Sequence, residues 1–369
     1  MKREGYFRPL LLVALALLLG SMLAGCEGAP AASTSTPSTL NLPAGLHVVG
    51  NRIGVSDGHT LTYHSYHGVN RSGSEYICTE KGSTFDGPSD QASINAILAW
   101  KVTIVRVPLN EDCWLGINGF PTAGRTAAEY RQDIVNYVEL LRQNNLAVIL
   151  DLHWNAPGSQ QALKQKPMPD ADHAPAFWSS VASTFKNDLF VMFDLYNEPY
   201  TIYWNCWLAG SAGANAKPCQ DVDFAVAGMQ TLINTVRSAG ASNVILVGGL
   251  DYANNMYGWL QYKPHDPQNN LAADFHIYPP NSCSDTACLD DAVAPVAAHY
   301  PVLTDEMGEF DCGDNFINGL MPWFDSHKIS YLAWAWDTHD CSQFPALISD
   351  YSGMPTGYGA GFKAHLSSF

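Results

Sequence analysis

Two glutamates follow apolar stretches at distant points of the 369-residue sequence. Glu198 comes directly after Asn197 in "FDLYNEP" (193–199), and Glu306 stands in "PVLTDEMG" (301–308). A carboxyl group can give or take a proton, or attack an electrophilic carbon. Two facing carboxyl groups could therefore divide an acid–base step and a nucleophilic step between them, provided that the fold brings them together.

Other apolar stretches also end in side chains that could serve such a site. These side chains belong to Arg106, His153, Asn197, His276, Tyr278 and Trp336. Arginine and tyrosine can donate hydrogen bonds that keep a carboxylate ionised, histidine can orient polar groups, and tryptophan offers a flat apolar face. Each residue taken alone has a structural explanation, in an ion pair or in the core. Their recurrence at successive strand ends favours one shared site.

The elements that must position these residues are short runs rich in branched and aromatic side chains, typical of parallel strands buried on both faces. They cover residues 65–70, 102–109, 146–154, 189–197, 243–249, 272–278, 301–306 and 329–336. Helical patterns separate several of them, and Thr126 with Glu129 forms a capping box. The pattern predicts an α/β fold, a (β/α)8 TIM barrel, with its active site at the C-terminal ends of the strands.

An open doubly wound sheet is the alternative fold. It would favour a glycine-rich phosphate loop after the first strand, and neither GxGxxG nor GxxxxGK[ST] occurs at such a junction. Before the first barrel strand, residues 45–63 predict a short N-terminal β-hairpin with its turn at Asp57 and Gly58. We expect this hairpin to close the lower end of the barrel.

Taken in order, the motifs resemble those of glycoside hydrolase family five, the cellulase family, over residues 65–340. They are "VRVPL", "LDLHW", "LYNEP", "HIY", "PVLTDEMG" and "WAWD". The resemblance implies retaining hydrolysis of β-linked polysaccharide, with Glu198 as acid/base and Glu306 as nucleophile. It also implies that Asn197 binds a sugar 2-hydroxyl and that Trp336 stacks on a sugar ring. Arg106 and Tyr278 would hold Glu306, and His153 and His276 would orient sugar hydroxyls or the carboxylates.

The motif "TDEMGEF" contains three acids, Asp305, Glu306 and Glu309. The family pattern selects Glu306 as the nucleophile. Side chains on a strand alternate between its faces, so with Glu306 in the cleft we expect Asp305 to point toward the helices or a neighbouring loop. Asp305 is the alternative nucleophile, and Glu309 falls in the loop beyond.

The substrate stays open at this point. An endo-β-1,4-glucanase is our first expectation, with a β-mannanase, an exo-acting glycosidase or a furanosidase as alternatives. Several tryptophans near strand ends or in long loops could form sugar platforms, although "YWNCWLAG" (203–210) could equally be a loop that packs its own aromatic side chains. These tryptophans are Trp154, Trp204, Trp207, Trp259 and Trp334.

Two other classes of protein could use residues of these types. A metal-dependent barrel hydrolase could use Asp151, His153 and His276, but the HxH pair expected at the first strand is missing from "YHSYHG" (63–68). A non-catalytic sugar-binding lipoprotein would be expected to lose one of the two carboxylates, and both are present. We therefore expect no metal and no cofactor, because two carboxyl groups suffice for the reaction.

The first residues have the pattern of a bacterial export signal. Basic residues precede an apolar run, and "LAGC" (23–26) resembles a lipobox with Cys26 as the lipidated residue. We expect a signal peptide over 1–26, a Ser/Thr/Pro-rich linker over 27–44 and a catalytic domain over 45–369. The protein would then be exported, held at the outer face of the cell membrane by its lipid or secreted, and monomeric. A net charge of −16 argues against nucleic acid as a partner.

Without Cys26 the chain has an even number of cysteines, which in an exported protein indicates disulfides. Proximity in the sequence suggests the pairs Cys78–Cys113, Cys206–Cys219, Cys283–Cys288 and Cys312–Cys341. A zinc site would usually show CxxC pairs, and none occurs.

Overall fold

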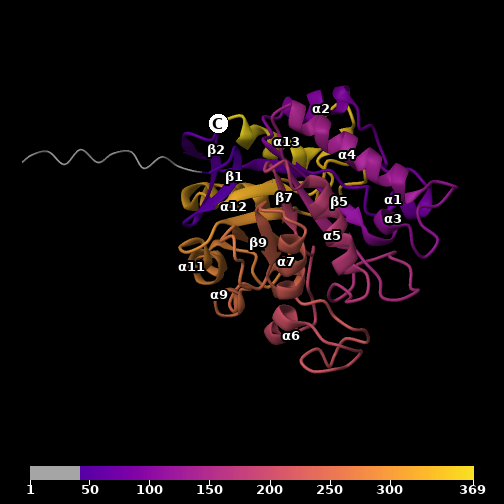
Figure 1. Ribbon diagram of the computed structural model, residues 1–369. Coiled ribbons are helices and arrows are strands. Elements are labelled where there is room, and N and C mark those ends of the chain that lie inside the picture. The colour runs from indigo at the N-terminus through magenta and orange to yellow at the C-terminus, as the bar shows by residue number, and fades with distance from the viewer. Residues whose placement is uncertain (1–41) are drawn as a thin grey trace, which may run out of the picture. The chain divides into compact units, whose positions relative to one another are not determined.

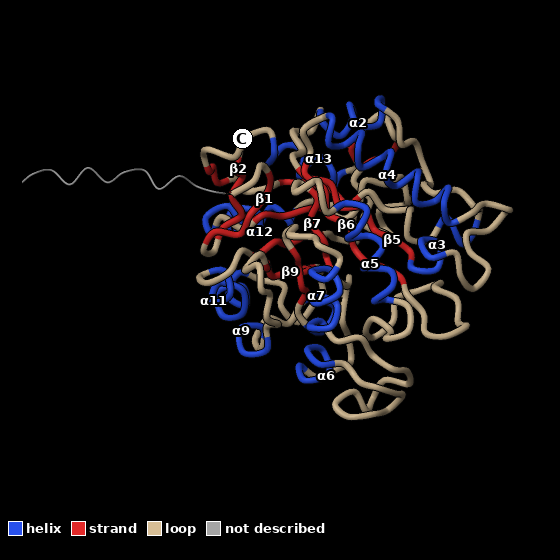
Figure 2. Tube along the Cα trace, viewed as in Figure 1, coloured by secondary structure: helices blue, strands red, loops and turns tan. Residues whose placement is uncertain are grey.

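The computed structural model describes residues 42–369. Eight parallel strands close into a barrel in the order β10-β11-β4-β5-β6-β7-β8-β9, and helices surround them (Figures 1 and 2). This confirms the predicted (β/α)8 barrel. The expected signal peptide, the lipidated Cys26 and most of the linker lie outside the described residues.

Each predicted strand overlaps one strand of the barrel. The barrel strands are β4 (His67–Asn70), β5 (Ile104–Asn110), β6 (Ala147–Trp154), β7 (Val191–Asp194), β8 (Ile245–Gly248), β9 (Leu271–Ile277), β10 (Val302–Met307) and β11 (Ser330–Ala333). Strand β11 ends three residues before the end of the predicted run, at Ala333 rather than at Trp336. Trp334 and Trp336 therefore lie beyond the strand, and their side chains need not follow its alternation of faces.

The helices differ widely in length. The longer ones are α2 (Gln91–Leu98), α4 (Ala127–Gln143), α5 (Ala174–Phe185), α7 (Met229–Ser238), α12 (Asn315–His327) and α13 (Gly357–Leu366). The short ones are α1 (Ile77–Glu80), α3 (Glu111–Leu115), α6 (Trp204–Ala209), α8 (Leu250–Ala253), α9 (Trp259–Tyr262), α10 (Thr286–Cys288), the π-helical turn η1 (Leu289–Val293) and α11 (Ala294–Ala297). Helix α4 begins at the predicted capping box, in which Thr126 and Glu129 each accept from the other's backbone N–H. Within residues 42–369, no helix combines the length and the apolar character needed to cross a bilayer.

The N-terminal segment forms a three-stranded antiparallel sheet rather than a single hairpin. Its strands are β1 (Gly45–Val49), β2 (Arg52–Ser56) and β3 (Leu61–Tyr63), and the predicted Asp57–Gly58 turn joins the last two. Leu46 and Ile53 pack against residues in the lower half of the barrel, such as Ile104 and Leu303. The sheet therefore closes the end of the barrel opposite the C-terminal strand ends. A second small hairpin joins β12 (Ile348–Asp350) to β13 (Met354–Pro355).

The interior of the barrel consists of two layers of different character. The lower layer is apolar and includes Ile104, Ile149, Met192, Leu246, Ala272, Leu303 and Leu332. Side chains two positions apart on a strand share a face. The next layer toward the C-terminal ends accordingly comes from Arg106, Asp151, Asp194, Asp274, Asp305 and Trp334. Apart from the tryptophan, these residues are charged or titratable and fully buried.

All four predicted disulfides are present. The structure pairs Cys78 with Cys113, Cys206 with Cys219, Cys283 with Cys288 and Cys312 with Cys341. Each pair links loops or short helices outside the barrel strands.

Candidate active site

A cavity of about 520 Å³ opens at the C-terminal ends of the barrel strands. Its lining residues are His153, Gln165, Asn197, Glu198, Tyr252, Tyr278, Pro279, Pro280, Asn281, Glu306, Phe310, Trp334, Phe344 and Pro345. Five of the residues predicted from the sequence, including both glutamates, lie in this wall. Arg106 and His276 are fully buried and contact the wall residues from beneath.

Glu306 lies at the end of β10 and is held by donors on both carboxylate oxygens. Arg106 Nη1 donates to Oε1 at 2.6 Å, and the Tyr278 hydroxyl donates to Oε2 at 2.7 Å. Burial, together with the neighbouring Glu306, raises the pKa of Tyr278 well above its usual value, so the phenol keeps its proton and remains a donor. The Glu306 carboxylate is therefore fixed in orientation with its charge compensated.

Glu198 follows β7 and faces Glu306 across the cavity. Its Oε1 lies 3.0 Å from His276 Nδ1, and the same histidine nitrogen is 3.5 Å from Glu306 Oε2. One oxygen of each glutamate and one nitrogen of His276 all lie within 4.8 Å of one another. The fold thus brings together two carboxyl groups that are more than a hundred residues apart in the sequence.

Asn197 lies beside Glu198 and is oriented by the same arginine. Arg106 Nη2 donates to Asn197 Oδ1 at 2.8 Å. The Asn197 amide nitrogen has only a long contact, 3.5 Å from Gln165 Oε1. That nitrogen remains able to donate to a group bound in the cavity.

Asp305 does not point toward the helices, so the expectation from strand alternation was wrong. The register of β10 against both neighbouring strands shifts between Leu303 and Met307. A bulge of this kind inserts one residue and interrupts the alternation of faces. Asp305 shares the inner face of Leu303, two positions before it, and the irregularity allows Glu306 to face inward as well. Asp305 therefore lies inside the barrel, with Oδ2 3.2 Å from Arg106 Nε and Oδ1 3.0 Å from His276 Nε2.

The neighbouring acids differ in their access to the cavity. Asp305 is fully buried beneath it and does not belong to its wall. Glu309 accepts from the backbone N–H groups of Phe316 and Ile317 at the start of α12. Of the three acids in "TDEMGEF", Glu306 alone lines the cavity.

The charged layer under the cavity contains more acids than bases. Together with the two glutamates of the wall, its acids are Asp151, Asp194, Asp274, Asp305, Glu198 and Glu306, and the basic side chains that contact them are Arg106, His153 and His276. Since a buried charge without a partner is costly, these acids cannot all be ionised together. Some of them must hold a proton at neutral pH.

The pKa shifts show which acids hold protons. Burial and the nearby Asp305 raise the pKa of Asp194 to about 8 and raise that of Asp274 well above its usual value. Burial would also raise the pKa of Asp305, but Arg106 and His276 outweigh it and lower that pKa. Burial opposes protonation of His276, yet Glu306 and Asp274 raise its pKa well above the usual range. These shifts favour the neutral form of Asp194 and Asp274 and the positively charged form of His276.

The profile of the family described as "Cellulase (glycosyl hydrolase family 5)" matches residues 62–340. The chain belongs to glycosyl hydrolase family 5. It is accordingly a glycosyl hydrolase, as the motifs at the strand ends indicated.

Relatives of this family 5 chain agree with that assignment. The manganese dependent endoglucanase Eg5A of Phanerodontia chrysosporium is 26% identical over 276 residues, which cover 71% of this chain and 61% of the relative. The chain thus spans less than two thirds of the length of that protein. A β-glucanase from Saccharophagus degradans superposes with a TM-score of 0.66 at 18% identity, over 89% of this chain and 95% of its own. A β-mannanase from Thermomonospora fusca gives 0.62 at 18% identity, over 88% and 97%. At these identities the solved structures show a shared fold.

The tryptophan in the wall of the family 5 cavity is Trp334, not the predicted Trp336. Strand β11 ends at Ala333, so the alternation that would carry Trp336 to the cavity stops before it. Trp336 is fully buried and packs edge-on against Trp100, with ring centroids 4.9 Å apart. Trp334 lines the cavity and stacks on His153 at 5.3 Å.

His153 is held from below by an acid of the charged layer. Its Nδ1 lies 2.8 Å from Asp151 Oδ2. Burial alone would lower the pKa of His153, but Asp151 outweighs this effect and raises it above the usual value. The imidazole lies between Asp151 and the cavity, stacked against Trp334, and Asp151 favours its protonated form.

Several wall residues escaped the sequence interpretation, among them Gln165 and Tyr252. Gln165 comes from the long loop after β6 and donates from Nε2 to the Glu198 backbone carbonyl at 2.8 Å. Tyr252 follows β8, stacks face to face with Tyr200 at 4.9 Å and is half-exposed. Neither residue stands at the end of an apolar run, so no strand-end pattern could have indicated it.

The disulfide-tied segment after β7 packs its own aromatic side chains, the second of the two readings of "YWNCWLAG". Trp204 and Trp207 meet edge to face at 5.1 Å, and Trp207 is fully buried. Trp259 is fully buried as well. Of the five tryptophans considered as platforms, Trp334 alone is in the cavity wall.

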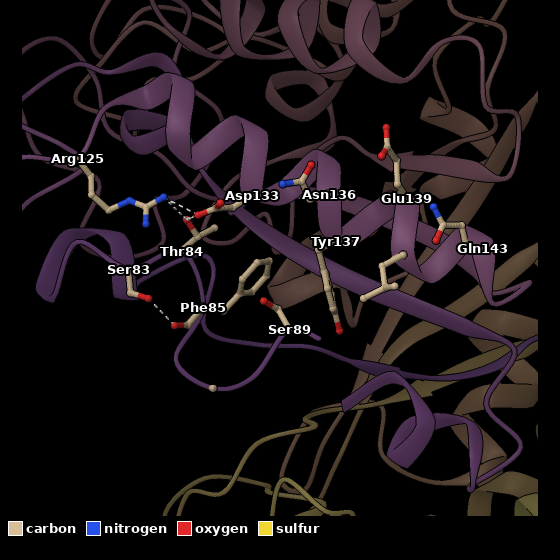
Figure 3. Close-up of a pocket in the computed structure, with 12 residues that line it drawn as sticks. Ser83, Thr84, Phe85, Ser89, Arg125, Asp133, Asn136, Tyr137, Glu139 and Gln143 are labelled. Atoms are coloured by element: carbon tan, nitrogen blue, oxygen red, sulfur yellow. Dashed lines mark hydrogen bonds and ion pairs between the residues drawn. The ribbon is translucent and has the colours of Figure 1, made fainter. Parts of the chain in front are cut away.

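A second cavity, of about 450 Å³, lies outside the barrel between α4 and the loop at residues 83–89. Figure 3 shows Arg125 directed toward Asp133 and Thr84, while the amides of Asn136 and Gln143 lie further along the helix. Its acidic groups are Asp133, which Arg125 pairs, and Glu139. This cavity lacks a facing carboxyl pair, and we place the active site at the strand ends.

Proposed function

We propose that the chain is a retaining endo-β-1,4-glucanase that uses Glu306 as nucleophile and Glu198 as acid/base. The observation that carries the proposal is the approach of the two carboxylates to within 4.8 Å, oxygen to oxygen. Retaining glycosidases place their carboxyl groups about 5 to 5.5 Å apart, whereas inverting enzymes need about 6.5 to 9.5 Å to admit a water molecule.

In the first step Glu306 attacks the anomeric carbon while Glu198 protonates the leaving glycosidic oxygen. The carbon–oxygen bond to the leaving sugar breaks as the glycosyl ester to Glu306 forms. Arg106 and Tyr278 hold the attacking carboxylate in place. Since His276 contacts Glu198 through Oε1, the other oxygen, Oε2, is available to carry the transferred proton.

In the second step a water molecule attacks the same carbon. Glu198, now ionised, removes a proton from this water, and the ester bond to Glu306 breaks. The sugar leaves with the configuration that it had in the substrate. Glu198 regains its proton and Glu306 its negative charge, so the enzyme returns to its starting state.

Two wall residues would bind the reacting sugar. Asn197 can donate from its amide nitrogen to the 2-hydroxyl, because Arg106 already occupies its oxygen. Such a contact strengthens as charge develops at the neighbouring carbon. Trp334 offers the apolar face that we had assigned to Trp336.

The proposal that the substrate is a glucan rests on similarity to a known enzyme. The curated relative is named an endoglucanase, and the chain covers only part of it. A β-mannanase is the second candidate, since one such enzyme shares the barrel. The manganese dependence in the relative's name has no place in this mechanism, because two carboxyl groups complete both steps.

Hydrolysis of a substrate panel tests the proposal. The panel contains carboxymethyl-cellulose, β-mannan, mixed-linkage glucan, xylan and aryl furanosides, each assayed with wild type, Glu198→Gln, Glu306→Gln and Glu309→Gln. We expect activity on the cellulose derivative that both cavity variants lose by more than about 10³-fold, since each removes a group required in the transition state. Glu309→Gln is the matched control, a buried glutamate outside the cavity. Preference for mannan would overturn the substrate, and activity in Glu306→Gln would overturn the nucleophile.

We also propose that residues 1–26 direct export and that Cys26 carries a lipid. The basic, apolar and LAGC segments of the sequence support this proposal. A radiolabelled fatty acid should be incorporated into the wild-type protein in cells and not into Cys26→Ser. Equal labelling of both proteins would overturn it.

A further inference from the structure

Outside the active site, two fully buried carboxyl groups meet without a permanent cation. Glu111 opens α3 directly after β5, and Asp170 lies in the long loop between β6 and α5. Both are 0% exposed. Among residues 42–369, the one basic side chain within 4 Å of either is His173, which precedes α5 and is partly exposed.

The contacts of this cluster leave one buried oxygen without a hydrogen-bond donor. Asp170 accepts from the His173 backbone N–H at 2.7 Å and from Asn155 at 2.8 Å. Glu111 Oε2 accepts from the Ala156 N–H at 3.2 Å. Glu111 Oε1 is buried and has no donor among the described residues. Leaving such an atom without a partner is costly, so either a proton shared by the two carboxyl groups or a bound cation is to be expected there.

The geometry of the cluster matches a shared ion. His173 Nδ1 lies 3.6 Å from Asp170 Oδ1 and 3.9 Å from Glu111 Oε2. One donor atom from each of the three residues lies within 4.8 Å of the others. Two ligands of one divalent ion, bound at roughly 2.0 to 2.4 Å, can be separated by up to twice that length. The three groups can therefore reach a common centre with small movements.

We propose that Glu111, Asp170 and His173 bind a divalent transition-metal ion, of which Mn²⁺ and Zn²⁺ are the best matches. Carboxylate oxygens suit Mn²⁺, imidazole suits Zn²⁺, and the mixed set disfavours Ca²⁺ and Mg²⁺, which prefer oxygen ligands alone. His173 Nδ1 lies 3.1 Å from the Ala156 carbonyl oxygen and donates to it in the absence of an ion. Binding of the ion through Nδ1 would displace this proton, and the carbonyl oxygen would then be free to act as a further ligand. The partly exposed imidazole gives the ion a route from solvent.

The position of this site gives it a structural role. It joins α3 to the two ends of the loop over residues 155–173, and α3 packs against α5 (Figure 1). The same loop carries Gln165, which donates to the Glu198 backbone. An ion at the base of the loop would fix the segment that supports Glu198 without touching the substrate, so its binding should appear first in stability.

The purified chain, dialysed against a chelator, tests the proposal by metal titration and thermal unfolding. With MnCl₂ we expect one ion per chain by calorimetry and a rise in melting temperature of about 5 °C at a hundredfold excess over the dissociation constant. ZnCl₂ should act similarly, and CaCl₂ should give a smaller rise. The elemental content of the dialysed protein establishes that the starting state is free of metal.

Variants locate the ion. His173→Gln should fold, because His173 makes no side-chain cap on α5, and it should lose most of the thermal shift. Glu111→Gln should lose it too while folding at least as well without metal, since it removes one of two adjoining buried acids. His339→Gln, which changes the exposed member of the cluster with Asp86 and Asp337, and Glu306→Gln, in the active site, should keep the full shift.

Three results would overturn the proposal. The first is wild-type protein that neither binds nor responds to either metal, which would mean that a proton or a charged His173 balances the acids. The second is a shift that survives in both His173→Gln and Glu111→Gln. The third is a shift lost in Glu306→Gln, which would place the ion between the catalytic carboxylates.

Discussion

Arg106 Nη1 lies 2.6 Å from Glu306 Oε1, and the same guanidinium contacts Asp305, Asp194, Asp151 and Asn197. One fully buried side chain therefore orients the proposed nucleophile, the neighbouring amide and part of the charged layer. Because Arg106 has so many partners, its removal would disturb folding and catalysis together. More specific tests change residues that make only one contact with the catalytic groups.

Tyr278→Phe removes one hydrogen bond to the nucleophile and little else. We expect kcat to fall by about 10²-fold, the usual effect of losing one well-placed donor. Tyr358→Phe is the control. The Tyr358 hydroxyl donates to the backbone carbonyl of Met307, which follows Glu306 on β10, and not to a carboxylate. This variant should lower the melting temperature and leave kcat within about twofold. Equal losses of kcat would show that strand β10 is sensitive to any change nearby.

Glu198→Ala should reveal the proton donor through the leaving group. A nitrophenolate can leave without being protonated, whereas the sugar alkoxide of a polysaccharide cannot. The variant should therefore retain much of its first-step rate on dinitrophenyl glycosides. On polysaccharide its rate should fall by roughly 10³-fold or more. Pre-steady-state release of the phenol measures the first step. If both substrates lose rate equally, Glu198 is not the acid.

The two tryptophans after β11 should separate binding from stability. Trp334→Ala removes a cavity wall and should lower kcat/KM by about 10- to 100-fold, since a large apolar face is lost. Trp336→Phe shrinks a core residue and should lower the free energy of unfolding by about 1–3 kcal/mol with unchanged kcat/KM. Steady-state kinetics and urea unfolding of both variants show which tryptophan contributes to substrate binding and which to stability. The opposite pattern would restore Trp336 as the sugar platform.

Asp194 should make the protein less stable as the pH rises. Its pKa of about 8 in the folded state lies above the value of 3.8 for an unperturbed group, so folded Asp194 keeps a proton that the unfolded chain releases. Between these values each pH unit costs up to about 1.4 kcal/mol of stability, and above about 8 the loss ends. Asp194→Asn imitates the protonated acid and removes this contribution. Urea unfolding at pH 5 and pH 7.5 should show a smaller decline for the variant; equal declines would mean that Asp194 is ionised throughout.

The sequence predicted the parts of the fold that depend on repeated local patterns. Apolar runs marked all eight strands, and polar side chains at their ends marked both glutamates, Arg106, His276 and Tyr278. The disulfides followed from proximity in the chain. Each of these features is local, or repeats often enough along the sequence to be recognised without tertiary contacts.

The errors occurred where a strand departs from regular alternation. Asp305 and Glu306 both face inward because an irregularity interrupts the alternation of β10, and Trp336 turned into the core because β11 ends at Ala333. Both changes depend on packing between neighbouring strands, which periodicity does not report. Gln165 and the Glu111–Asp170–His173 cluster come from a long loop and a short helix, and their positions become known only when the chain has folded.

The two layers of the barrel interior have a consequence for how this protein can change. The lower layer carries apolar side chains closed off by β1 and β2, whereas the upper layer carries the acids and bases that hold the glutamates. A substitution among the lower residues alters packing far from the reacting atoms, while one in the upper layer alters the charge of several partners at once. Thermal tolerance can therefore evolve, or be engineered, in one half of the barrel while the chemistry is inherited unchanged in the other.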